Sequence, residues 1–147
     1  VQLQSVGETR MLPLEKFILG NRKTAKKEDE LISGIFIPRP AKKARGNFEK
    51  LGTRAYLVIS IVMVGVVAEL NERDEVLNLK IAVGACSPVA QRLRLLEQEA
   101  VGKKLKSIEI IPAHFESLEP IDDIRATADY RKKVVPELLL RAIKGVI

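Results

Sequence analysis

Several residue types are scarce in this chain, and each shortage excludes a class of protein. A single cysteine, Cys86, has no partner for an internal disulfide. Together with the single histidine, His114, it provides too few ligands for a zinc site or an iron–sulfur cluster, which need about four. Tryptophan is absent, and aromatic residues make up only 4% of the chain. The core must therefore be built from aliphatic side chains, and no metal site is expected.

Nucleotide-binding and catalytic motifs are also missing. The glycines are scattered with no pair two residues apart, so there is no G-x-G-x-x-G segment to approach a pyrophosphate. The sequence has no Walker loop, metal-binding H-E-x-x-H helix or G-x-S-x-G nucleophile elbow. A catalytic Cys86–His114 dyad requires that folding bring the two side chains together. The flanking patterns favour instead a buried thiol and a structural histidine. No catalytic residue is assigned.

No hydrophobic run is long enough to span a membrane. The longest, at residues 57–68, falls short of the roughly 18–20 residues that a spanning helix requires. Its many β-branched residues favour a buried strand. The first residues alternate apolar and polar, unlike a signal peptide. With the lone thiol, these features predict a cytoplasmic protein without a membrane partner.

The residues that are present describe a globular domain with a basic surface. Hydrophobic residues make up 46% and charged residues 30% of the chain, and the net charge is +6. The basic residues are not interleaved with aromatic residues as a nucleic-acid stacking surface requires, so no nucleic-acid partner is expected. A basic loop at residues 39–45 could dock a protein partner or, less favoured, nucleic acid.

The apolar periodicity changes along the chain from about two to about 3.6 residues. We expect short strands at residues 1–3 and 10–12, a helical turn, and further strands. The closing helix is expected to begin at Asp122 or Asp123, with Tyr130 on its packed face. Strands followed by helices predict an α+β fold, with an antiparallel sheet of three to four strands packed against about three helices. The later elements are expected at residues 14–19 (helical turn), 30–37 and 47–51 (strands), 56–84 (a hairpin with Leu77, Leu79, Ile81 and Val83 on one side), 88–102 (a helix capped by Ser87) and 107–118 (a helix broken by Pro112).

Six short segments carry more information than their periodicity. They read LPLEKFILGNRKT at residues 12–24, EDELI at 28–32, IFIP at 35–38, FEKLGTR at 48–54, IAVGACSP at 81–88 and DDIRATADYR at 122–131. In this order and spacing they resemble the FAD-binding subunits of molybdenum hydroxylases, the medium subunits of carbon monoxide dehydrogenase-like enzymes and the flavin domain of xanthine dehydrogenase. In the last segment, Thr127 stands where the family usually has serine.

The resemblance implies a domain organisation and a cofactor. Residues 1–27 would be the end of the FAD-binding domain and a connection, and residues 28–147 the C-terminal α+β domain. This domain would form one wall of a cleft that holds FAD. The complete subunit would transfer electrons between FAD and the iron–sulfur clusters of a partner subunit, beside a molybdopterin subunit. A homo-oligomer remains open.

Two positions are implied to contact the flavin: Ile32, and Lys50 beside Phe48. From the pattern alone, Lys50 is more simply a solvated lysine on an edge strand. A lysine near the flavin ring could stabilise its anionic reduced form.

The glycine-rich segments that hold the FAD phosphates in this family are not in this sequence. We therefore expect a chain that binds FAD weakly alone and is inactive as an enzyme without the rest of an FAD-dependent dehydrogenase. The alternative is a non-catalytic structural or interaction domain that docks partner subunits.

Overall fold

The chain forms two compact units, which the computed structural model describes over residues 1–146. The units are Val1–Pro40 and Ala41–Ile147. Both contain antiparallel strands and helical segments, so the predicted α+β class is confirmed. The domain boundary that the family resemblance implies between residues 27 and 28 stays a prediction. The division after Pro40 follows from contacts within each unit and does not test that boundary.

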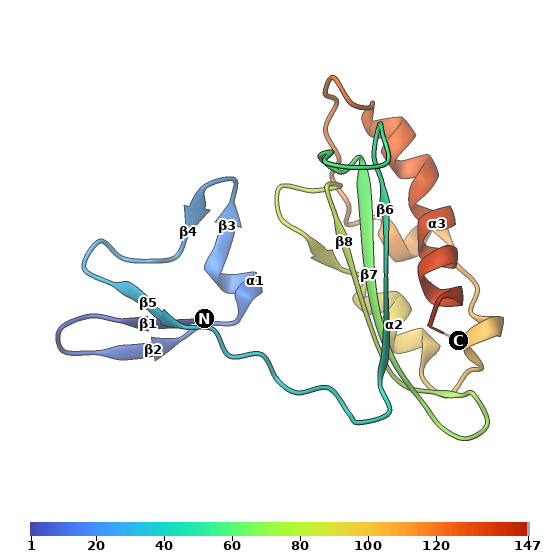
Figure 1. The fold of residues 1–147 in the computed structure, drawn as a ribbon, viewed down its shortest axis with the longest axis horizontal. Helices are drawn as coiled ribbons and strands as arrows, with labels where there is room; N and C mark the ends of the chain where they lie inside the picture. Colours follow the sequence, from blue (N-terminus) through green and yellow to red (C-terminus); the bar gives the residue numbers. More distant parts are fainter. Residues whose placement is uncertain (147) are drawn as a thin grey trace. The chain divides into compact units, whose positions relative to one another are not determined.

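The first unit is a small sheet with a short helix and an added hairpin (Figure 1). Strands β1 (Gln2–Gln4), β2 (Thr9–Met11) and β5 (Leu31–Gly34) pair in the order β2-β1-β5. Helix α1 (Leu14–Phe17) leads into β3 (Ile18–Gly20), which pairs with β4 (Lys23–Thr24). The predicted pair of strands at the start of the chain is confirmed. The strand expected at residues 30–37 is shorter.

The second unit is built on a four-stranded antiparallel sheet in the order β6-β7-β8-β9. Its long hairpin joins β7 (Val62–Leu70) to β8 (Val76–Gly84), which confirms a hairpin in the predicted region. The edge strands are β6 (Arg45–Leu51) and β9 (Gln91–Arg92). The strand expected from residue 56 begins only at Val62.

The two faces of this sheet have different surroundings. Helices α2 (Arg94–Ala100) and α3 (Ala128–Lys144) lie against one face, on the right in Figure 1. Because strand residues alternate between faces, every second residue of β7 points into this layer. The resulting core is aliphatic, as the scarcity of aromatic residues predicts. From the sheet it takes Val62, Val64, Val66, Ala68, Leu79, Ile81 and Val83.

The alternation expected along β8 fails at Leu77, which is exposed. Leu70 pairs with Val76 and Glu69 with Asn78, so Leu77 is the extra residue of a β-bulge. Val76 takes the buried place instead. A bulge shifts the side-chain pattern by one residue, which a strict two-residue period cannot anticipate.

The helix predicted from Pro88 with a Ser87 cap begins later. The Ser87 hydroxyl donates to the carbonyl of Cys86 and accepts from the amide of Glu119, and β9 follows before α2 starts at Arg94. Gly102 has a φ of +79° beyond the end of α2. The helix expected at residues 107–118 is replaced by two 3₁₀ turns, η1 (Leu105–Ser107) and η2 (Pro112–Phe115).

The closing helix is present, but its first cap is Thr127. The Thr127 hydroxyl accepts the amide of Tyr130 at 3.2 Å, and an Asp122 carboxylate oxygen accepts the amide of Ala128 at 2.5 Å. Asp122 thus accepts a free backbone amide of the first turn although it lies outside the helix. Tyr130 is 46% exposed and does not pack as expected. The buried stripe of α3 consists of Arg131, Val135, Leu138, Leu139, Ala142 and Ile143.

Arg131 is a buried cation that joins three separate parts of the second unit. Its Nη1 donates to the carbonyls of Ile61 at 2.5 Å and Ala85 at 3.0 Å, and its Nη2 donates to Asp123 Oδ1 at 2.7 Å. Asp123 also accepts the amides of Arg125 and Ala126. These hydrogen bonds lower the pKa of Asp123 to about 2.

Replacing Asp123 with asparagine should change the acid stability of the chain. The folded pKa of Asp123 lies below its unfolded value, so the carboxylate stabilises the fold above about pH 4. That contribution is lost as pH falls from about 4 towards 2. Urea unfolding followed by circular dichroism between pH 2 and 7 should therefore show a shallower acid slope for Asp123→Asn than for the unsubstituted chain. Parallel profiles would contradict this assignment.

Candidate functional site

Lys50 lies on the face of the sheet that the helices leave open. It is exposed, and it shares its face of β6 with Gly46 and Phe48 because each is two residues from the next. Its Nζ donates to the carbonyl of Val58 at 2.7 Å. The prediction of an exposed lysine on an edge strand is confirmed, and the bond to Val58 adds a contact with the backbone of the following loop.

Residues 52–60 form this loop, and its backbone is held in place by hydrogen bonds. Besides the bond from Lys50, Arg54 Nη2 donates to the carbonyl of Leu57 at 2.6 Å, and the amide of Ile61 closes the loop on Leu51. A Cβ at Gly52 would lie 2.4 Å from Val58 Cγ1, so any larger residue at position 52 would require Val58 to shift. The backbone of this loop is therefore held in one conformation.

The loop exposes apolar side chains, and its backbone is strained at Leu57. Leu57 is 93% exposed and has a φ of +49°, a conformation that costs a non-glycine residue on the order of 1 kcal/mol or more. Tyr56 and Ile59 are also exposed. Strained, exposed apolar residues are typical of surfaces that contact another molecule.

A shallow groove of about 660 Å³ crosses the open face, and Phe48, two residues before Lys50 on β6, lines it. Phe48 pairs with Gly65, Gly65 with Ala82, and Ala82 with Arg92, so one cross-strand row runs from an aromatic ring to a guanidinium. Lys80 lines the groove from the neighbouring row. The Arg92 guanidinium is paired with the Glu97 carboxylate, so the positive charge on this face comes from Lys80 and from Lys50. An apolar floor beside these lysines suits a flat ring that carries negative charge.

Ile32, the other predicted contact, lies in the first unit. It lies on β5, where it pairs with Leu3 of β1, and its side chain is 51% exposed. The strand is anchored by Glu30, which accepts Arg10 Nε at 2.5 Å and the amide of Lys27 at 2.6 Å. The Arg10 hydrogen bond is the main cause that lowers the pKa of Glu30 to about 2. Ile32 and Lys50 belong to different units, so their shared role stays a prediction.

Cys86 and His114 have structural environments. Burial raises the pKa of the Cys86 thiol to about 11. His114 is buried, and its Nδ1 accepts the amide of Ile111 at 3.1 Å. The proton therefore resides on Nε2, which donates to Glu99 at 3.1 Å. Both ring nitrogens are thus occupied by partners other than Cys86, which supports the structural interpretation of each residue.

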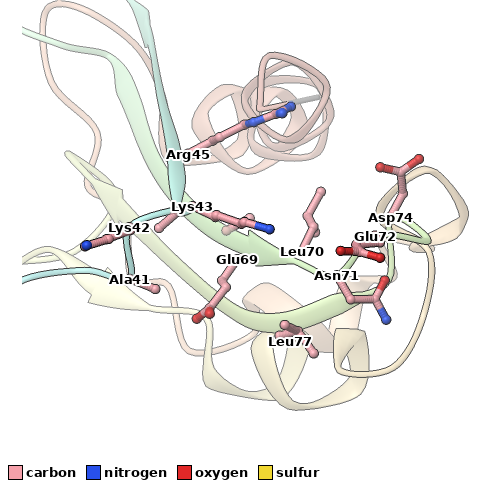
Figure 2. A pocket seen from close by; sticks show the side chains of 12 residues that line it. Ala41, Lys42, Lys43, Arg45, Glu69, Leu70, Asn71, Glu72, Asp74 and Leu77 are labelled. Atoms are coloured by element: carbon pink, nitrogen blue, oxygen red, sulfur yellow. The ribbon is translucent and has the colours of Figure 1, made fainter.

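A second hollow, of about 630 Å³, lies between the basic loop and the β7–β8 turn. Figure 2 shows Lys43 extending towards Leu70, while Lys42 points away from it. The far side carries Glu72 and Asp74. These carboxylates would repel a phosphate backbone, so the hollow does not favour nucleic acid; the absence of a nucleic-acid partner stays a prediction.

No metal centre is found in the described part of the chain. Among residues 1–146, no group of three or more His, Cys, Asp or Glu side chains is placed to hold an ion. None of the described helices is both long and apolar enough to cross a membrane.

Sequence reasoning missed the two polar clusters that shape the site. One is the Arg131 network. The other is Glu97, whose Oε1 accepts the backbone amide of Ile81 at 2.8 Å and Arg92 Nε at 2.5 Å. The sequence shows a glutamate near the start of an apolar helix. Only the fold shows that its carboxylate accepts a backbone amide of β8 at a point where the short β9 provides no partner.

Cys86 should be unreactive while the chain is folded. A thiol with a pKa of about 11 is almost entirely protonated at pH 8, and burial blocks access as well. We expect a disulfide reagent at pH 8 to label Cys86 at least a hundredfold more slowly in buffer than in 6 M guanidinium, followed by absorbance of the released thiolate. Similar rates in the two solvents would show the assignment to be wrong.

Comparisons with known proteins agree on one family. Residues 48–146 match the CO dehydrogenase flavoprotein C-terminal domain. The nicotine 6-hydroxylase medium subunit of Paenarthrobacter nicotinovorans is 29% identical over 97% of this chain and 50% of its own length. Carbon monoxide dehydrogenase from Hydrogenophaga pseudoflava, solved without the Mo-pyranopterin moiety of its molybdenum cofactor, is 25% identical with a TM-score of 0.86. That match covers 99% of this chain and 51% of the solved chain.

A further solved structure supports the fold alone. Quinoline 2-oxidoreductase from Pseudomonas putida 86 has a TM-score of 0.77 at 22% identity, over 99% of this chain and 52% of that one. The chain thus spans about half the length of the relatives that it matches.

Proposed function

The chain belongs to the CO dehydrogenase flavoprotein C-terminal domain family, and on this premise we propose that it forms one wall of the FAD site in a molybdenum hydroxylase. In this proposal, the complete flavoprotein subunit transfers electrons between FAD and the iron–sulfur clusters of a partner subunit, beside a molybdopterin subunit. The position of Lys50 carries the proposal: it lies on the open sheet face, two residues along β6 from Phe48, which lines the groove.

The residues of this face fit the ring of a flavin better than its phosphates. The groove floor is apolar at Gly65 and Ala82, and Lys80 lies at its margin. By contrast, the sequence has no glycine-rich loop to hold a pyrophosphate. The chain therefore supplies a wall for the ring, and the phosphate contacts must come from another polypeptide segment.

Bound FAD would supply the reversible electron transfer, and the role of Lys50 is electrostatic. An ammonium group has three donors, and one is committed to Val58. The others can point to an anionic ring atom. A charge-assisted hydrogen bond at a partly desolvated site stabilises the negative form by about 1–3 kcal/mol. Ile32 would add an apolar contact from the first unit.

A role in docking is the second candidate function, and the loop at residues 52–60 favours it. Tyr56, Leu57 and Ile59 are exposed on a backbone that Lys50 and Arg54 hold in one shape. A preformed apolar projection loses little entropy when it binds, which suits contact with a partner subunit. The two functions can coexist, because the groove and the loop tip use different side chains.

Replacing Lys50 with alanine in a complete subunit should disfavour the reduced flavin. The subunit can be made by joining to this chain the half of the nicotine 6-hydroxylase medium subunit that the chain does not match. Loss of a bond worth about 1–3 kcal/mol weakens binding of reduced FAD roughly 5- to 150-fold relative to oxidised FAD. A spectroscopic redox titration measures the corresponding fall in midpoint potential. Lys43→Ala removes an exposed lysine away from the groove and should leave the potential unchanged.

The unmodified chain should bind FAD weakly by itself. Most of the affinity for FAD should come from phosphate contacts that this chain cannot make. Titration of FAD followed by flavin fluorescence should give no stoichiometric complex at micromolar concentrations. A tight yellow complex would contradict the division of labour proposed here, as would an unchanged potential in Lys50→Ala.

A further inference from the structure

The two edges of the four-stranded sheet differ in how well their backbone groups are covered. At the β8 edge, the amide of Ile81 donates to the Glu97 carboxylate, and β9 pairs with the residues that follow. At the other end of β8, Val76 accepts the amide of Gly102 and donates to the carbonyl of Lys103. The opposite edge is β6, a strand of seven residues whose only partner among the described strands is β7.

The uncovered side of β6 presents the backbone of three alternate residues. Leu51 accepts the amide of Ile61, so its backbone groups face β7. Because these groups alternate between the two sides of a strand, those of Gly46, Phe48 and Lys50 face away from β7. All three residues are exposed, and no other described residue is bonded to their outward backbone groups. An open edge of this kind is a template for another strand.

The side chains of β6 restrict how a second β6 can pair with it. An antiparallel pair of identical strands has a twofold axis through one residue. Outward backbone groups meet only if that residue is Asn47, Phe48 or Glu49. An axis through Glu49 would place two carboxylates opposite each other, which is destabilising. An axis through Asn47 would leave Lys50 opposite residue 44, which precedes the strand.

An axis through Phe48 uses the whole edge. Lys50 then lies opposite Gly46 of the second copy, so all three outward residues of each strand exchange backbone hydrogen bonds. A lysine protects an edge from pairing when it meets a like charge, but here it meets glycine. The two Phe48 rings face each other, and aromatic cross-strand pairs add to the stability of a sheet.

We propose that two copies of this chain associate through β6, with the twofold axis at Phe48, and form one continuous sheet. The open faces then make one surface, and the grooves that Phe48 lines meet at the axis. Gly46 of the second copy lies opposite Lys50, so the second copy contributes to the candidate site. The inference goes beyond the proposed function, because it concerns the backbone edge and requires no flavin.

The test measures self-association of the unmodified chain by sedimentation equilibrium, without FAD. One pair of strands buries little area, so we expect a weak dimer that forms as the concentration rises to about 1 mM. Phe48→Lys removes the aromatic pair and places like charges at the axis, and it should weaken the dimer at least tenfold. Tyr130→Lys is the matched control, because it makes the same change of charge at an exposed aromatic residue of α3, and it should leave the dimer unchanged.

Hydrogen exchange followed by NMR compares the two sides of the strand within the unmodified chain. The outward amides of Gly46, Phe48 and Lys50 should exchange freely in the monomer and become protected as the dimer forms. The amides of Asn47 and Glu49 face β7 and should be protected at every concentration. The alternation of these responses identifies the edge as the interface even if a substitution disturbs folding.

Three outcomes would overturn the inference. They are a monomer at all concentrations, a dimer that Phe48→Lys leaves equally strong, and a dimer in which the outward amides stay unprotected. The first would reserve the edge for a strand of another protein, and the other two would assign self-association to a different surface. A flavin potential that does not depend on Lys50 would reject the proposed function and leave this interface standing.

Discussion

The second unit depends on one buried guanidinium. Arg131 extends from α3 and binds the carbonyls of Ile61 and Ala85 and the carboxylate of Asp123. These groups stand before β7, after β8 and before α3. Burying a charge is costly unless it is paired and hydrogen-bonded. The Arg131 Nε has no partner among the described residues, so the bonds of Nη1 and Nη2 carry this pairing and tie the three segments to one geometry. That geometry also sets where the 52–60 loop returns to the sheet.

Once α3 and α2 cover one face of the sheet, the other face is free for function. Most aliphatic residues of β7 and β8 lie in the covered face. The groove on the open face is lined by Phe48, Val67 and Lys80 and by residues with little or no side chain, Gly65 and Ala82. Alternate residues of the same strands thus point to opposite faces, where one set forms the core and the other forms the candidate site.

Local patterns predict most of the elements, and tertiary contacts explain the differences. The hairpin and closing helix follow from periodicity, and the scarcity of aromatic residues correctly indicates an aliphatic core. The bulge at Leu77 and the late start of α2 depend on pairing with β7 and β9, which no local window contains. Lys50 could be singled out from the sequence by resemblance. Its bond to Val58 could not, since it requires the shape of the loop.

The hydrogen bond between Lys50 and Val58 has a consequence for how variation in this family should be interpreted. A Cβ at Gly52 would lie 2.4 Å from Val58 Cγ1, so a side chain there would force a shift of Val58, whose carbonyl accepts the ammonium group. A substitution at residue 52 would therefore act on the Lys50 side chain through Val58. Under the proposed role of Lys50, such a substitution would influence the cofactor without touching it, and its effect would depend on the presence of the lysine.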